Sequence, residues 1–156
     1  MSADEPAIDY EDASCRIGRW RSVVMSCWVE PPTSEQMQRM RATLDRAMAR
    51  PDPIAFVILV RSGDRLALTD AARSDLGSTF RSSSSRRGPT AVIIEASGFR
   101  AAFVRSLMSG IFLVTRAGAR KNRIFGARAE GLAWVRGEID GLDGIDAALE
   151  TIARGF

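Results

Sequence analysis

The sequence contains no histidine among its 156 residues, and Lys121 is its one lysine. The absence of histidine excludes Ser-His-Asp and Cys-His nucleophile pairs and every metal site with an imidazole ligand. No GxxxxGK[ST], GxGxxG, CxxC or GxSxG motif occurs. Only carboxylate or hydroxyl chemistry remains, so we expect a protein that is not an enzyme and that holds no metal or cofactor. An enzyme would have to use Asp64, Asp70 or Glu95, with a divalent metal.

The two cysteines, Cys15 and Cys27, are too few for a disulfide framework, and both lie in or beside apolar segments. We expect reduced, buried thiols. No apolar run reaches the roughly 18–20 residues that a membrane span needs. The segment 1–12 is polar and acidic, unlike a secretory signal. We therefore expect a cytoplasmic protein without a membrane span.

The composition, 46% hydrophobic and 26% charged, is typical of a globular chain. The net charge of +3 conceals a segregation, because residues 1–13 carry five acids and no base, and residues 137–156 carry five acids against Arg154. The segment between them stands at +12, from 21 bases and nine acids. This pattern indicates an anionic partner, ends that fold back over a basic body, or simply an arginine-rich composition. The bases are not interleaved with aromatic residues, so we expect no nucleic-acid partner.

Periodicity predicts an alternation of strands and helices. Strands are expected at 15–17, at 21–30 with one half-buried face, at 54–60 in the centre of a sheet, at 90–95 and at 123–125. Thr33 and Gln36 form a capping-box pattern before a helix over 34–50. Thr69 or Asp70 can cap a helix that runs towards Phe80. Further helices are expected over 99–114 and 127–135, and Asp143 is expected to cap an amphipathic helix at the C-terminus.

The expected helix over 99–114 carries more apolar residues than one face needs. Either it is unusually enclosed, or its surplus faces a partner or ligand. A homodimer would bury such a surplus cheaply. The residues of this candidate ligand or interface patch are Phe103, Leu107, Met108 and Phe112.

These elements predict an α/β fold with a mostly parallel sheet of four to five strands and an antiparallel edge. We expect residues 1–13 to be a disordered acidic tail, residues 14–136 to form the α/β domain, and residues 137–156 to be a helical extension. The order resembles the STAS domain, and it looks closest to the SpoIIAA-like group of anti-sigma-factor antagonists. The resemblance covers roughly residues 15–136. It includes a strand ending at Glu95 that runs at once into a helix, and Ile124-Phe125 followed by Ala133-Trp134-Val135.

The resemblance implies a partner surface at the helix that follows the central strand. The antagonists carry Asp-Ser-Ser-Gly there, and a kinase phosphorylates the second serine. Here the matching string is Leu68-Thr-Asp-Ala-Ala72, in which Asp70 matches the acid and alanines replace both hydroxyls. The serine switch is therefore not carried over, and Thr69 or Ser84 would be the alternative phosphorylation sites.

The sequence therefore predicts a non-catalytic regulatory module that binds a protein partner or a second copy of itself. We expect the interface at the carboxyl ends of the strands, where open α/β sheets bind ligands. The alternative is a lipid-binding or small hydrophobic-ligand domain, because the SpoIIAA-like group is similar in fold to Sec14-type lipid carriers. The candidate partner-binding residues are Arg61, Asp64, Thr69, Asp70, Ser97 and Gly98.

Overall fold

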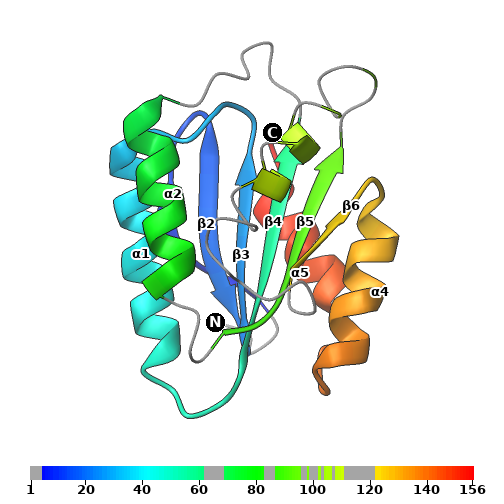
Figure 1. Cartoon of the computed structure of the whole chain (residues 1–156). Helices are drawn as coiled ribbons and strands as arrows, with labels where there is room; N and C mark the ends of the chain where they lie inside the picture. The colour runs from blue at the N-terminus through cyan, green and yellow to red at the C-terminus, as the bar shows by residue number, and fades with distance from the viewer. Residues whose placement is uncertain are drawn as a thin grey trace.

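In a computed structural model of the chain, the six strands among the described residues form one sheet in the order β1-β2-β3-β4-β5-β6 (Figure 1). The structure describes residues 5–61, 69–82, 87–95 and 122–156, together with residues 98, 102, 104–106 and 108–110. β1 to β3 are antiparallel to one another, and β3 to β6 are parallel. The α/β class and the mostly parallel sheet with an antiparallel edge are confirmed, and the sheet has one strand more than the four to five we predicted.

The antiparallel edge is built from β1 (Ala7–Glu11), β2 (Cys15–Trp20) and β3 (Val23–Trp28). β1 corrects the expectation of a disordered tail for the residues it contains. The expectation of a half-buried β3 is also wrong, since all six of its residues are buried. α1 (Ser34–Met48) covers the second face of β3, and there Ser26 accepts a hydrogen bond from the Trp28 indole at 2.8 Å.

The parallel part contains β4 (Ile54–Arg61), α2 (Asp70–Ser82), β5 (Arg87–Glu95) and β6 (Asn122–Phe125). β4 lies inside the sheet between β3 and β5, as its two apolar faces predicted. The capping box of α1 is present, because the Thr33 side chain accepts from the Gln36 N–H and the Gln36 side chain accepts from the Thr33 N–H. Residues 102, 104–106 and 108–110 are helical, in agreement with the helix predicted there.

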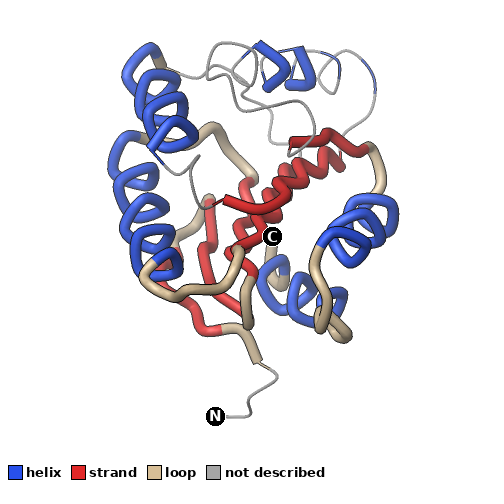
Figure 2. The backbone as a smooth tube through the Cα atoms, turned by 60° about the horizontal axis from the view of Figure 1, so that its bottom comes forward, coloured by secondary structure: helices blue, strands red, loops and turns tan. Residues whose placement is uncertain are grey.

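Two layers of helices cover the sheet (Figures 1 and 2). α1 packs on one face in a cluster with Ile54 and Phe56, and the adjoining cluster of Val92 and Ile94 includes Met108. α4 (Arg128–Glu138) and α5 (Ile145–Ala153) cover the opposite face. Among the described residues, no helix is long and apolar enough to cross a membrane.

The C-terminal helix belongs to the main core. Ile145, Leu149 and Ile152 are all 0% exposed and pack in one cluster with residues of β2 to β5. Residues 137–156 are therefore an integral layer of the domain rather than an appended extension. Its N-cap is Gly144, at φ 92° and without a side-chain cap, so the expectation that Asp143 caps it is wrong.

Both acidic ends fold back over the basic body. Asp9 of β1 accepts two hydrogen bonds from Arg19, at 2.6 and 3.0 Å. At the other end, Glu150 of α5 accepts from Arg128 at 2.6 Å. Of the alternatives for the charge segregation, the structure therefore supports the folded-back ends. These pairs attach the first strand and the last helix to the rest of the sheet.

Candidate partner-binding site

The predicted partner-binding residues that the structure describes, Arg61, Thr69, Asp70 and Gly98, end, follow or begin elements at the carboxyl end of the parallel strands. Arg61 is the last residue of β4, Glu95 is the last residue of β5, and the two are register partners. Thr69 immediately precedes α2, and Asp70 begins it. Gly98 is exposed and has φ 71°. Asp64, Ser84, Ser97, Phe103, Leu107 and Phe112 lie outside the described residues.

Arg61 and Glu95 belong to a chain of ion pairs that connects β4 and β5 to both helices of the α4/α5 face. The Arg61 Nε lies 3.3 Å from Glu95 Oε2, and Arg128 donates to both Glu95 oxygens at 2.8 and 3.0 Å. Arg128 also donates to Glu150 at 2.6 Å, and Arg61 donates to the main-chain oxygen of Phe156. The hydrogen bonds that it donates to Glu95 raise the pKa of the Arg128 guanidinium above its ordinary value. Because guanidinium groups occupy both oxygens of Glu95, this carboxylate is an anchor in the structure.

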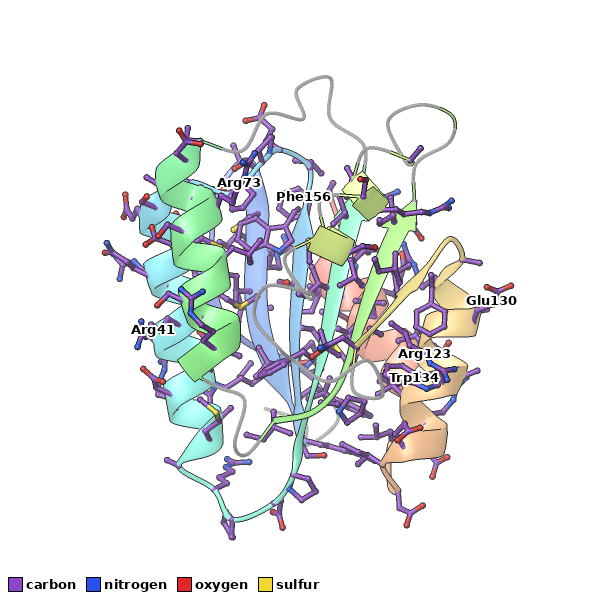
Figure 3. All side chains as sticks on the ribbon, in the orientation of Figure 1. Arg41, Arg73, Arg123, Glu130, Trp134 and Phe156 are labelled. Carbon is purple, nitrogen blue, oxygen red and sulfur yellow. The ribbon has the colours of Figure 1, made fainter. Side chains whose placement is uncertain are left out.

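Arg16 holds the C-terminal end of α5 against the same end of the sheet. Its NH1 group donates to the main-chain oxygens of Thr151, Ile152 and Arg154, at 3.0, 3.1 and 2.7 Å. These are carbonyls of the last turn of α5 and just after it, which a helix leaves without intrahelical partners. The guanidinium also lies 5.1 Å from the centre of the Phe156 ring, which Figure 3 shows near the carboxyl end of the sheet.

Asp12 connects the β1–β2 turn to the start of α1. Its carboxylate accepts from the Tyr10 hydroxyl and the Gln36 amide, both at 2.7 Å, and from the N–H groups of Ser14 and Cys15, at 2.7 and 2.8 Å. Desolvation opposes ionisation, but these donors, led by Gln36 and Tyr10, outweigh it and hold the pKa of Asp12 well below its usual range. The hydrogen bond that the Tyr10 hydroxyl donates to Asp12 raises the pKa of Tyr10 to about 12.

Thr69 and Asp70 form an exposed helix start. The Thr69 hydroxyl accepts from the Ala72 N–H at 3.1 Å, so Thr69 is the cap and Asp70 is an acid of the first turn. Ala72, in the first turn of α2, is 0% exposed. The exposed polar residues of the cap and first turn are Thr69, Asp70 and Arg73, and Ser74 follows them.

The described residues contain no metal centre and no thiol site. No group of three or more acidic or cysteine side chains among them could hold a metal ion. Cys15 and Cys27 are buried free thiols that belong to core clusters on opposite faces of the sheet, so they cannot form a disulfide. Burial raises the pKa of Cys15 to about 12 and that of Cys27 to about 11, which keeps both thiols protonated.

The candidate apolar patch is represented in the described residues by Met108. Its side chain is 6% exposed and packs against Val92, Ile94 and Val104. At this residue the helix is therefore enclosed, which was one of the two alternatives. Among the described residues, the one large hydrophobic side chain that is exposed is Ile8, at 41%.

Sequence reasoning missed Arg16, Arg128 and Asp12. Arg128 carried a usable signal, because a basic residue in the first turn of a helix is unfavourable beside the positive end of the helix dipole unless a carboxylate meets it. Arg16 interrupts an apolar strand, and Asp12 lay in the segment expected to be disordered.

Comparison of the chain with protein-family models, curated proteins and solved structures finds no match.

Proposed function

We propose that this protein is a non-catalytic regulatory domain that binds a protein partner, similar in role to the anti-sigma-factor antagonists but without their serine switch. One observation carries the proposal. The ionisable side chains best placed for chemistry at the carboxyl end of the sheet, Arg61 and Glu95, are bonded to each other and to Arg128. Because they are paired in this way, Arg61 and Glu95 offer a fixed, charged surface rather than a free acid or base.

The contact region of this proposal is the start of α2. Thr69, Asp70 and Arg73 are exposed there, and Figure 3 shows Arg73 beside the carboxyl end of the sheet. An exposed acid and an exposed base within one helical turn can select a partner by complementary charge. The buried Ala72 supports a switch-free surface, because no hydroxyl is available at that position.

The resemblance to the SpoIIAA-like group adds the regulatory character. The α/β class and the mostly parallel sheet with an antiparallel edge support the resemblance at the level of fold class. We place the protein in the cytoplasm as part of the same proposal.

Affinity capture from the native host tests the proposal through a matched pair of variants. Asp70→Arg changes the exposed start of α2, whereas Asp45→Arg makes the same charge change on the exposed side of α1. A specific partner should be lost with Asp70→Arg and kept with Asp45→Arg, and circular dichroism should show both variants folded. A partner that survives Asp70→Arg would contradict the assigned surface.

Native mass spectrometry of protein from the host separates this proposal from its alternatives. The proposal expects a bare chain or a complex with another protein. A co-purifying lipid in one-to-one ratio would instead support the hydrophobic-ligand domain. A species 80 Da heavier, mapped to Thr69 or Ser84, would restore a phosphorylation switch.

A further inference from the structure

A groove of about 700 Å³ opens at the amino ends of β3 and β4, at the opposite end of the sheet from the candidate partner-binding site. Figure 2 brings this end of the molecule towards the viewer. Three of the lining side chains, Val23, Ala47 and Ile54, are buried at 1%, 8% and 3% exposure. Ile139, after α4, also lines the groove and is half-buried. The three buried side chains form the floor of the groove, and the half-buried Ile139 in the same lining offers the apolar surface that an aliphatic group can contact.

Charged side chains surround that floor, and the fold already uses two of the three arginines among them. Arg19 makes two hydrogen bonds to Asp9, at 2.6 and 3.0 Å. Arg21 lies over the Trp20 ring, 4.5 Å from its centre, and donates to the Gly141 carbonyl at 2.6 Å. Both guanidinium groups are therefore held by the protein itself.

The remaining charges of the groove are mostly acidic. They are one base, Arg50, and three acids, Asp52, Glu138 and Asp140. None of these four side chains forms a hydrogen bond or an ion pair in the part of the chain that the structure describes. The Gly141 carbonyl does not cancel the charge of Arg21, so outside the Arg19–Asp9 pair the lining carries two bases against three acids, in a chain whose overall net charge is +3.

The ends of two helices add to this negative field. α1 ends at Met48 and α4 ends at Glu138, so both C-terminal ends lie at the groove. A helix C-terminus carries a partial negative charge and favours a cation, which makes an acid at that position locally unfavourable. Glu138 is the last residue of α4, and Asp140 lies before the Gly144 N-cap of α5, outside its first turn, so neither acid is compensated by a helix start. An acid kept at the unfavourable end of a helix dipole is typical of a functional site, where local stability is sacrificed for binding.

We propose that this groove docks a short basic segment of a partner protein, with an arginine or lysine flanked by aliphatic residues. The aliphatic residues contact Ile139 at the buried floor that Val23, Ala47 and Ile54 form. The cationic head lies between Asp52, Glu138 and Asp140. The apolar floor and the unpaired carboxylates select this partner by shape and by complementary charge. The groove is remote from the start of α2, so this inference stands or falls independently of the proposed function.

An NMR titration with a defined probe tests the inference. The probe is the capped peptide acetyl-Ala-Leu-Arg-Leu-Ala-amide, added to ¹⁵N-labelled full-length protein. Its control is the same peptide with glutamate in place of arginine. We expect saturable shifts at Arg50, Asp52 and residues 137–141, weakened by added salt. Equal binding of the glutamate peptide would overturn the proposal, as would shifts elsewhere and none at the groove.

Two matched double variants locate the interaction. Asp52→Asn with Glu138→Gln neutralises the groove, and Asp45→Asn with Glu130→Gln makes the same charge change at exposed positions outside it. Because two exposed charge contacts are lost, the affinity for the arginine peptide should fall by about fivefold. The control should bind within about twofold of the wild type, because distant surface charges are largely screened. An equal loss in both variants would mean a net-charge effect and would refute a specific groove.

Discussion

At the carboxyl end of the sheet, Arg61, Glu95 and Arg128 bond to one another, whereas at the amino end Asp52 and Glu138 have no partner among the described residues. At the carboxyl end, the ion pairs connect α4 and α5 to the strands. At the amino end, the carboxylates around the apolar floor of the groove stay unpaired among the described residues. Removing a charge should therefore destabilise the fold at one end and leave it unchanged or stabilise it at the other. This difference can be measured with single substitutions.

The largest effect is expected for Arg16→Met at the carboxyl end. Methionine keeps most of the apolar contact but leaves three carbonyls at the end of α5 and the Glu11 carboxylate without their donor. Hydrogen bonds from a charged donor predict a loss of about 2–3 kcal/mol in the free energy of unfolding, measured by urea denaturation. Arg39→Met, at an exposed position of α1, should change it by less than about 0.5 kcal/mol. Equal losses would show that Arg16 does not anchor α5.

The second effect concerns Asp12 and depends on pH. Asp12→Asn removes an acceptor of several hydrogen bonds and should cost about 2 kcal/mol at neutral pH. Because the folded pKa lies below that of the unfolded chain, the contribution is complete above the unfolded value of about 4 and is lost as the pH falls. The stability difference between wild type and variant should therefore be constant from pH 7 to 5 and shrink below about pH 4. A difference that does not change with pH would contradict the assigned ionisation.

The sequence predicted the features that depend on neighbouring residues and missed those that depend on contacts between different strands. The capping box at Thr33 and the buried β4 follow from neighbouring residues, and both were predicted. β1 was missed because the segment reads as acidic and polar, and its pairing depends on Asp9 meeting Arg19 on the next strand. A contact of this kind depends on how the strands meet and is not visible in local periodicity.

The candidate site was predicted in part for the same reason. Arg61 and Glu95 end neighbouring apolar strands, so their meeting could be expected from a parallel sheet. Arg128 completes their network only because α4 docks on the opposite face from α1. The groove could not be predicted, because β2, α1 and α4 form it together from segments far apart in the chain.

Glu95→Gln tests the network at the centre of the carboxyl end. Glutamine keeps the shape of the side chain but removes the charge that holds two guanidinium groups. Since these pairs are partly exposed, we expect a loss of about 1 kcal/mol in the free energy of unfolding. Added salt should reduce the difference between wild type and variant. A variant as stable as the wild type would show that α4 docks without this network.

The smallest effect has the opposite sign and lies at the amino end. Glu138→Gln removes an unpaired acid from the last residue of α4, where it faces the negative end of the helix dipole. Its loss should raise the free energy of unfolding by about 0.5 kcal/mol, measured by urea denaturation beside Glu130→Gln. Glu130 lies in the first turn of the same helix, where an acid is favourable, so that substitution should lower the stability by a similar amount. If both changes destabilised the protein equally, Glu138 would be a structural residue of α4. If Glu138→Gln is the stabilising one, the chain keeps an acid at the groove at a cost to its own fold, which is what a binding role for that acid requires.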